Sequence, residues 1–469
     1  MALSEARHAD TQGAPPASSH LPVPRPSLRA MTRCFARIGL LSFGGPAGQI
    51  ALMHRELVDE KRWIDEKRFL HALNYCMILP GPEAQQLATY TGWLLHRTLG
   101  GLIAGLLFIL PGAGLMLALS ILYVLYRSVP AVDAAFLGIK AAVLAIVLQA
   151  LLRIGRRALI DRFSRSVALA AFLALFMLQI PFPLVIMAAG LAGWIAHGRR
   201  PSAVAASAGA PAPLPSAIDT MLAEGMLEHT RPCARTALRV LVVWLALWLT
   251  PLLVSVLALG PDAVFTQIAG FFSLMAAVSF GGAYAVLAYV AQAAVEGLGW
   301  LAPGEMLDGL GLAETTPGPL ILVLQFVGFL AAYRNPGILD PFLSGSIGAA
   351  LTLWVTFAPS FLWIFLGAPY VEALRGHQRL AAALSAVTAA IVGVILNLSL
   401  WFGLHILFRQ TRPLNGAGIG PDIPILASFD WRAGCLALLS AALLLRFKLG
   451  VAPLLAIGAG AGILLGRLG

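Results

Sequence analysis

Residues 40–50 read LLSFGGPAGQI, an apolar stretch interrupted by Gly44, Gly45 and Pro46, and the same tetrapeptide, SFGG, recurs at residues 279–282. Glycine and proline in succession end a helix instead of extending it. Inside a bilayer, backbone that leaves a helix is tolerated only where it is buried in protein or lines a water-filled cavity. Two identical breaks in apolar surroundings therefore indicate a structural or functional need for them.

The composition places these breaks in a membrane protein. Hydrophobic residues make up 59% of the 469 residues, charged residues make up 12%, and the mean hydropathy is +0.83. Apolar runs at 102–126 and 240–259 are long enough to cross a bilayer as helices. A transmembrane β-barrel would need alternating ten-residue segments, which the sequence lacks. We therefore predict an all-α polytopic membrane protein.

Several classes of function find no support in the sequence. The net charge of +10 comes mainly from connecting segments, and no basic domain studded with aromatic residues indicates nucleic-acid binding. Four widely separated cysteines form no CxxC pair, and the nine histidines form no HExxH. No metal site, cofactor motif or nucleophile triad is visible. We therefore expect no cofactor, no metal and no enzymatic activity.

Two Pro- and Ala-rich segments divide the chain. Residues 1–30 are polar, lack the apolar core of a signal peptide, and are expected to form a disordered cytoplasmic tail. Residues 198–236, which contain RRPSAVAASAGAPAPLPSA, are expected to be a cytoplasmic linker. The hydrophobic remainder forms two units, at 31–197 and 237–469.

These two units are an internal repeat. At a constant offset of 237 residues, SFGG at 42–45 aligns with 279–282, Trp63 with Trp300, and PGP at 80–82 with 317–319; after an insertion, Pro111 aligns with Pro359. Matching hydrophobic segments interrupted by Gly or Pro are the best sequence indicator of a secondary transporter. Duplicated packing units are the alternative.

The repeats are expected to have opposite orientations in the membrane. Residues 54–68 hold five Lys or Arg, whereas the equivalent residues 291–305 hold none, so the positive-inside rule puts these loops on opposite sides. If SFGG and PGP are the tips of re-entrant hairpins, Arg97 lies inside and Arg127 outside. Arg409, Arg412 and Arg432 fall outside and do not fit this scheme.

The first repeat resembles the chromate ion transporter family in the segments SFGGPAGQI, EKRWIDEKRF and MILPGPEAQQLATYTGW, and the second repeat carries the matching second domain. The resemblance implies a multi-pass protein of the bacterial inner membrane that exports chromate, uses the proton-motive force and gives chromate resistance. Its implied partners are chromate, protons and the lipid bilayer, with a homodimer left open. The alternatives are a transporter of another tetrahedral oxyanion such as sulfate, and a passive anion channel.

The helix breaks are the predicted substrate-binding positions. A tetrahedral dianion inside a bilayer needs fixed donors, and unpaired amides at helix N-termini supply them. Glycine also lets the backbone approach an oxyanion closely. The candidates are Gly44, Gly45, Gly81, Gly281, Gly282 and Gly318, with hydroxyl donors from Ser42 and Ser279. Tight packing corners, and hydroxyls that bond back to their own helices, are the alternatives.

Charged residues supply the remaining candidates. Lys140 lies about nine residues into a predicted helix, ~13 Å deep, and is assigned to the substrate; pairing with Asp133 or snorkelling is the alternative. We predict that four arginines guide the anion, although each also suits a membrane-surface role: Arg33, Arg37, Arg97 and Arg334. Glu83 and Glu314 flank the PGP motifs and are candidates for proton coupling or for helix capping.

Overall fold

The computed structural model describes residues 24–43, 45–77, 79–196, 216–279, 283–370, 378–413 and 422–467. Nearly all of them are helical, which confirms the predicted all-α class. Within this part of the chain, five helices are long and apolar enough to cross a membrane: Glu83–Tyr126, Pro130–Ala158, Ala234–Leu259, Pro341–Tyr370 and Ala382–Leu407. Their apolar side chains face either other helices or the hydrocarbon of a bilayer.

The first repeat contains seven described α-helices and one π-helical turn. They are α1 (Leu28–Leu41), α2 (Gly45–His54), η1 (Arg55–Glu60), α3 (Glu66–Cys76), α4 (Glu83–Tyr126), α5 (Pro130–Ala158), α6 (Arg162–Phe176) and α7 (Phe182–Ala196). The predicted tail thus overlaps the start of α1, where the Ser27 side chain accepts a hydrogen bond from the Ala30 amide. This contact satisfies one of the free amides at the start of the helix.

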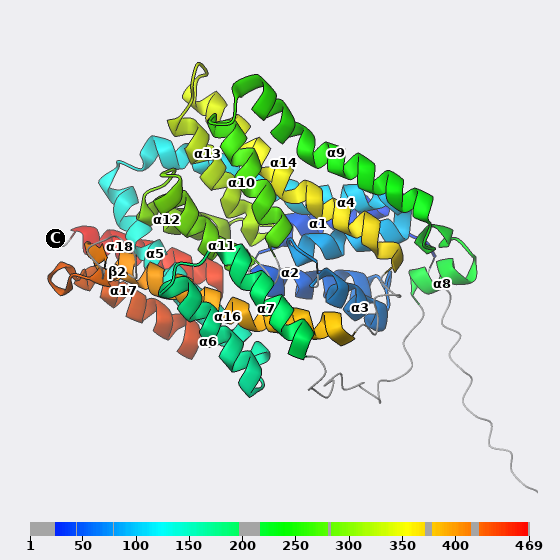
Figure 1. The fold of residues 1–469 in the computed structure, drawn as a ribbon, viewed down its shortest axis with the longest axis horizontal. Helices are drawn as coiled ribbons and strands as arrows, with labels where there is room; N and C mark the ends of the chain where they lie inside the picture. Colours follow the sequence, from blue (N-terminus) through cyan, green and yellow to red (C-terminus); the bar gives the residue numbers. More distant parts are fainter. Residues whose placement is uncertain are drawn as a thin grey trace, which may run out of the picture.

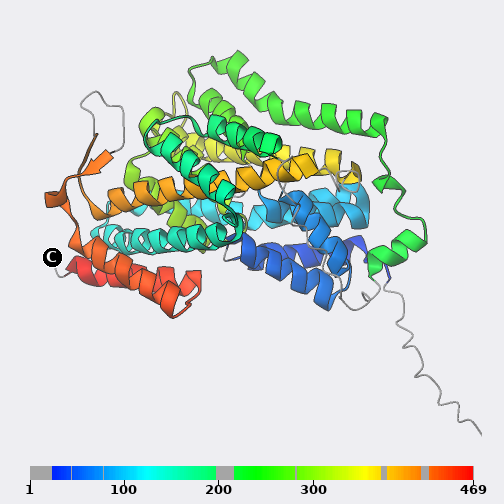
Figure 2. The same ribbon diagram turned by 60° about the horizontal axis from the view of Figure 1, so that its bottom comes forward.

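The segment between the repeats also contains helices. Part of the predicted linker forms α8 (Ala217–Ala223), η3 (Glu228–Thr230) and the start of α9 (Ala234–Leu259), a span that lies along the edge of the bundle in Figure 2. Arg68 Nη1 contacts Asp219 Oδ1 at 2.9 Å, and the Ala217 amide donates to the Arg62 carbonyl at 3.0 Å. The linker is therefore packed against the basic loop of the first repeat.

The second repeat follows the same order of elements. It contains α10 (Val264–Val278), α11 (Ala283–Gln292), η4 (Ala293–Gly297), α12 (Pro303–Thr315), η5 (Leu320–Leu322), α13 (Val323–Arg334), α14 (Pro341–Gly367), η6 (Ala368–Tyr370) and α16 (Gln378–Leu407). After a short hairpin of β1 (Thr411–Pro413) and β2 (Asp422–Pro424) come η7 (Leu426–Ser428), α17 (Trp431–Ala441), η8 (Ala442–Arg446) and α18 (Val451–Arg467).

Equivalent backbone hydrogen bonds confirm the internal repeat. Each repeat has a π-helical turn, η1 or η4, followed by a buried tryptophan. The Trp63 amide donates to the Leu57 carbonyl at 2.8 Å, and the Trp300 amide donates to the Ala294 carbonyl at the same distance. Both pairs are related by the offset found in the sequence. The two repeats therefore share local backbone structure as well as sequence.

The helix that follows each PGP motif folds back on itself. Within α4 the backbone leaves helical geometry at His96 and Arg97, which has a φ of +55°. Gly92 then lies against Gly100, where an added Cβ would approach the Gly100 carbonyl oxygen within 2.4 Å. In the second repeat, Gly328 of α13 and Gly348 of α14 make the equivalent close contact. Each repeat therefore contains a helical hairpin that carries PGP at one of its ends.

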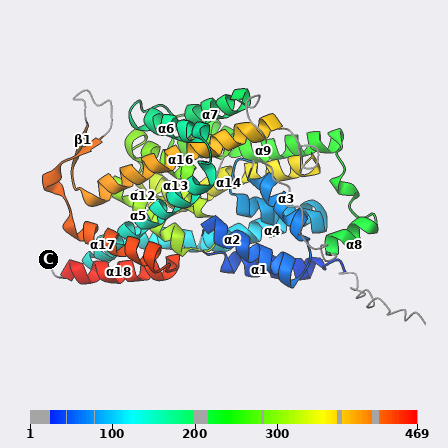
Figure 3. The same ribbon diagram turned by 90° about the horizontal axis from the view of Figure 1, so that it is seen from below.

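The C-terminal helices of each repeat pack on the other repeat. Helices α6 and α7 lie on α16, and α17 and α18 lie on α5 (Figures 1 and 3). The contact between α5 and α18 is close at Gly138 and Gly458, where an added Cβ on Gly138 would be 1.8 Å from the Gly458 carbonyl oxygen. The glycine run that begins at Gly458 is therefore a helix-packing surface.

The loop between α16 and α17 places a cation beside a carboxylate. Arg409 Nη2 lies 3.0 Å from Asp430 Oδ2, and Asp430 also accepts hydrogen bonds from the first amides of α17. Burial acts to raise the pKa of Asp430, but these donors outweigh it and hold the pKa below its ordinary value. The ion pair with Asp430 partly neutralises Arg409, one of the three arginines that do not fit the positive-inside scheme.

Candidate functional site

The helix breaks of the two repeats meet each other. The Gly318 amide donates to the Ser42 carbonyl at 2.9 Å, and the Gly81 amide donates to the Ser279 carbonyl at 3.1 Å. These bonds are equivalent under the repeat, because each joins the SFGG motif of one half to the PGP motif of the other. We call this arrangement the crossing, defined by Ser42, Gly81, Ser279 and Gly318.

Glycine is required at the crossing for conformational reasons. Gly81 has a φ of +119° and Gly318 a φ of +92°, values that residues with a side chain rarely adopt. Ser42 and Ser279 end α1 and α10 with nearly identical backbone angles, φ −77° and ψ 61° against φ −80° and ψ 55°. The matching angles turn each serine carbonyl toward the opposite repeat.

Proline-containing helices surround the crossing. An added Cβ on Gly81 would lie 2.5 Å from the Ser360 Oγ, one residue after Pro359 in α14. Across the pseudo-symmetry, an added Cβ on Gly112, one residue after Pro111 in α4, would lie 2.0 Å from the Pro317 carbonyl oxygen. Each PGP motif therefore packs beside the helix proline of the other repeat.

Two glutamines of the first repeat make polar contacts near the crossing. Gln49 Nε2 donates to the Gly318 carbonyl at 2.5 Å and lies 3.4 Å from the Ser42 carbonyl, whereas its repeat equivalent is Val286. Gln86 Nε2 donates to the Pro80 carbonyl at 2.8 Å. The crossing is thus symmetric in its backbone and asymmetric in its side chains.

Buried polar atoms without a hydrogen-bond partner lie beside these contacts. Among the described residues, the Ser360 hydroxyl and the side-chain oxygens of Gln49 and Gln86 have no partner, although the three side chains are at most 1% exposed. Unpaired buried polar groups are unfavourable, and in native proteins they often mark functional positions. Of the three, only the Ser360 hydroxyl is a donor that an anion could use, because amide oxygens accept hydrogen bonds.

The predicted donors at the breaks are engaged in this structure. The Ser42 hydroxyl donates to the Ile38 carbonyl and the Ser279 hydroxyl to the Ala276 carbonyl, so both bond back to their own helices, as the alternative interpretation holds. The amides of Gly81 and Gly318 are used across the crossing instead of facing a solute. A buried N–H without a partner is costly, so it bonds to the nearest carbonyl.

The remaining glycine candidates are placed differently. Gly45 begins α2 with a φ of +70°, and no atom lies within 4 Å of an added Cβ. Its conformation therefore requires glycine, whereas its surroundings leave space. Gly44, Gly281 and Gly282 lie outside the described residues.

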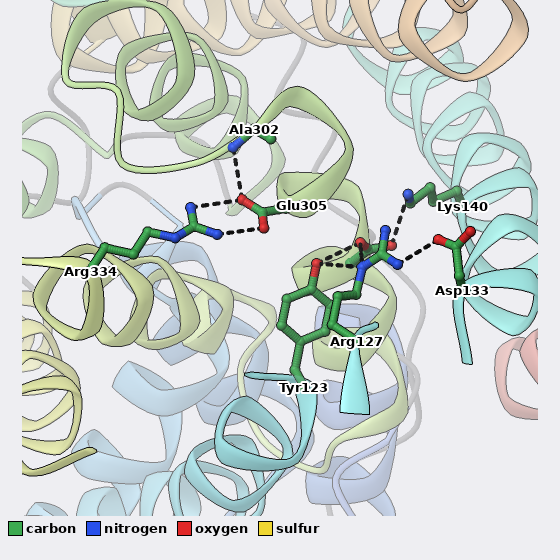
Figure 4. A network of polar contacts seen from close by, with 8 residues as sticks. Tyr123, Arg127, Asp133, Lys140, Ala302, Glu305 and Arg334 are labelled. Carbon is green, nitrogen blue, oxygen red and sulfur yellow. Dashed lines mark hydrogen bonds and ion pairs between the residues drawn. The ribbon is translucent and has the colours of Figure 1, made fainter. Parts of the chain in front are cut away.

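Lys140 lies in a separate group of charged side chains, shown in Figure 4. Its Nζ is 3.3 Å from Asp308 Oδ1 on α12, nine residues before PGP, so it is not part of the crossing. The alternative prediction, that Lys140 pairs with Asp133, was wrong, because Asp133 pairs with Arg127. We call Tyr123, Arg127, Lys140 and Asp308 the Asp308 cluster.

The four predicted guiding arginines have different partners. Arg37 is 3.4 Å from the buried carboxylate of Glu56, while Arg33 is exposed on the same helix. Arg334 makes a bidentate ion pair with Glu305 (Figure 4) and also donates to the Trp300 carbonyl. Arg97 is exposed at the fold-back turn of α4. The structure therefore does not place these arginines in one group.

The two proton-coupling candidates flank the crossing. Glu83 is the first residue of α4, directly after PGP, and is partly buried. Glu314 is in the last turn of α12, just before PGP, and is 5% exposed. Both carboxyls are therefore within a few residues of the crossing, as their sequence positions predict.

Sequence reasoning missed Gln49, Gln86, Ser360 and Asp308. One signal was present for Asp308, which is an acidic residue between Glu305 and Glu314 in the largely apolar segment that precedes the second PGP motif. A charged residue in such a segment marks a functional position by default. The glutamines and Ser360 carry no comparable signal, because isolated polar residues are common in helices.

Membrane-spanning helices in two repeats, with interrupted helices that meet at the repeat interface, are typical of a membrane transporter. The sequence matches the chromate transporter family model over residues 29–194 and 266–465, and the chain belongs to this family. It is therefore a transport protein and not an enzyme.

Relatives include chromate transport proteins from several bacteria. The chain is 36% identical to that of Pseudomonas aeruginosa over 84% of this chain and 83% of the relative. It is 27% identical to that of Cupriavidus metallidurans, over 93% and 92%. A probable chromate transport protein of Synechococcus elongatus is also 27% identical, over 79% and 84%. No solved structure matches the chain.

Proposed function

We propose that this protein is a secondary-active transporter that exports chromate from the cytoplasm across the bacterial inner membrane and so gives chromate resistance. Membership of the chromate transporter family supports the substrate. The observation that carries the proposal is the crossing, where the helix breaks of one repeat bond to those of the other. A binding site shared by two repeats is the arrangement that alternating access requires.

The crossing suggests how a tetrahedral dianion binds. The amides of Gly81 and Gly318 donate to serine carbonyls in this structure, so an anion must replace those carbonyls to use them. The replacement separates SFGG of one repeat from PGP of the other. Binding of the anion at the crossing is thereby coupled to relative movement of the two repeats, which is the step that a transporter needs.

The inverted orientation of the repeats forms part of this proposal. The tail and the linker contact the fold-back of α4, through Pro26 to His96 and His229 to the Trp93 carbonyl. At the other end of the second segment of α4, Arg127 lies near Asp308, three residues after Glu305. That segment has about 29 residues and a length of ~43 Å. The loops before α3 and α12 are thus associated with opposite ends of one spanning helix.

The energetics favour export. A dianion that leaves a negative-inside cell gains about 4 to 5 kcal/mol per 100 mV of membrane potential, at ~2.3 kcal/mol per charge. The proton-motive force includes this potential and supplies the drive. Glu83 and Glu314 are the proposed carboxyls for exchange of a proton, because both flank the crossing.

Chromate uptake into everted membrane vesicles tests the proposal, together with tolerance and accumulation in cells with and without the protein. Concentrative uptake that an uncoupler abolishes is expected, with tolerance raised in the expressing cells. Uptake that only equilibrates chromate would indicate a passive channel. At saturating concentrations, a reduction of chromate uptake by about half with equimolar sulfate would indicate a general transporter of tetrahedral oxyanions. No chromate movement above the empty-vector control would refute the function.

A further inference from the structure

The Asp308 cluster joins the two repeats through charged side chains. Asp308 belongs to α12 of the second repeat, and the three side chains that face it belong to the first. Tyr123 donates its hydroxyl to Asp308 Oδ2 at 2.8 Å, Arg127 Nε lies 3.5 Å from the same oxygen, and Lys140 Nζ lies 3.3 Å from Oδ1 (Figure 4). One carboxylate therefore holds together three donors from the opposite repeat.

The carboxylate is fully buried but only partly satisfied. The Asp308 side chain is 0% exposed, and within the described residues Oδ1 accepts no hydrogen bond. The Lys140 ammonium lies 3.3 Å from Oδ1, within ion-pair distance. A buried carboxylate is stable when its oxygens accept several hydrogen bonds. Asp308 Oδ1 therefore depends on the Lys140 ammonium as its partner within the cluster.

The three donors form a set that suits an oxyanion. A phenol, a guanidinium and an ammonium converge on two oxygens, and guanidinium and ammonium groups are the usual protein partners of carboxylate and phosphate-like anions. Helix α12 leaves room for the ammonium, because an added Cβ on Gly304, one turn before Asp308, would lie 3.1 Å from Lys140 Nζ. The second repeat is thus shaped around the donors of the first.

We propose that Tyr123, Arg127 and Lys140 form a second anion site, which Asp308 occupies as an internal counterion until a doubly charged tetrahedral oxyanion displaces it. The inference rests on the proposed function, because the displacing anion is the transported one. The donors and the carboxylate lie on different repeats, so the exchange breaks a contact between the repeats. Anion binding at this site is therefore linked to separation of α12 from α4 and α5.

Anion binding to the purified full-length protein in lipid nanodiscs tests the proposal, with chromate and sulfate as titrants. Asp308→Asn keeps the size of the side chain but removes the competing charge. Its affinity for both anions should rise about tenfold, the factor that removal of a competing interaction of ~1.4 kcal/mol gives. Lys140→Met should weaken binding by a similar factor, and transport by Asp308→Asn should fall because the internal counterion no longer resets the site.

Asp133→Asn is the matched control. Asp133 also pairs with Arg127 and carries the same charge, but its side chain is 63% exposed and lies in the same repeat as the donors. Asp133→Asn therefore tests the general effect of removing one negative charge. The affinity for chromate and sulfate should change less than about threefold, because an exposed ion pair contributes little. An Asp308→Asn affinity equal to that of wild type or of Asp133→Asn would overturn the proposal.

Three further outcomes distinguish failure of the second anion site from failure of the proposed function. If Asp308→Asn does not give monodisperse protein, Lys140→Met and Arg127→Gln decide, since unchanged anion affinity in both would overturn the site. A wild-type protein that binds sulfate with the expected variant pattern, yet moves no chromate, would refute the proposed function and support the site. Normal chromate export without the affinity gain in Asp308→Asn would refute the site alone.

Discussion

Substitution of Gly81 by alanine tests the structure of the crossing. The φ of +119° costs a residue with a side chain about 1 to 3 kcal/mol. The added Cβ would also lie 2.5 Å from Ser360 Oγ and 2.8 Å from Gln86 Nε2, an overpacking that costs a further ~1 to 3 kcal/mol. Gly81→Ala should therefore lower the free energy of unfolding by about 2 to 6 kcal/mol and impair transport.

A double-mutant cycle separates the two costs. Ser360→Ala removes the nearest atom and should by itself be close to neutral, because that hydroxyl has no hydrogen-bond partner among the described residues. In the double variant the conformational cost remains and part of the overpacking is relieved, so the coupling free energy should be ~1 kcal/mol or more. Denaturant titration in mixed micelles measures the four unfolding free energies, and vesicle uptake of chromate measures transport.

Alanine substitutions at two other glycines, Gly318 and Gly45, allow the destabilisation at Gly81 to be compared with sites that have more space. An added Cβ on Gly318 would be 3.3 Å from its nearest neighbours, and on Gly45 it would meet nothing within 4 Å, although both have positive φ. The destabilisation by alanine should therefore decrease in the order Gly81, Gly318, Gly45. Additive effects of Gly81→Ala and Ser360→Ala, or equal costs at all three glycines, would refute the packing described for the crossing.

Three further changes test other parts of the structure. Gln49→Leu should destabilise the protein by about 1 to 3 kcal/mol in the same titration, because it leaves the Gly318 carbonyl without its side-chain donor; an unaltered unfolding free energy would contradict that contact. Cysteines at Arg68 and Glu305 should react with a membrane-impermeant thiol reagent from opposite faces, and same-side labelling would rule out the inverted orientation. Arg409→Gln should lower the thermal unfolding temperature at pH 7, because it removes the ion pair with Asp430. The pKa of Asp430 is depressed in the folded state, so this decrease in unfolding temperature should persist down to about pH 4 and disappear only as the pH falls further, through the folded pKa. A decrease that becomes larger on acidification would contradict this ion pair.

The sequence predicted the all-α class, the repeat and the positions of the helix breaks, because Gly, Pro and hydrophobic length act locally. It did not predict that SFGG of each repeat bonds to PGP of the other. The partners Ser42 and Gly318 are 276 residues apart, and no local pattern encodes which of two equivalent motifs a carbonyl will meet.

The ion-pair partner of Lys140 also could not be predicted from the sequence. Asp133 lies two helical turns away on the same helix and was the nearest carboxylate in sequence, but it is exposed and pairs with Arg127. Lys140 instead pairs with Asp308, which α12 brings to it from the second repeat. The partly buried Lys140 pairs with the buried carboxylate because charges inside a low-dielectric interior gain more from pairing than charges near water.

The packing of α6 and α7 on α16 has a consequence for biosynthesis. Roughly 180 residues separate the end of α7 from the start of α16, so at the usual 5 to 20 residues per second the ribosome needs about 10 to 40 s to deliver the surface that those helices cover. During that interval the newly inserted half has an incomplete apolar face within the lipid. The nascent protein must wait for its own second half, and a gene cut between the two should yield an active product only when both fragments are made in the same cell.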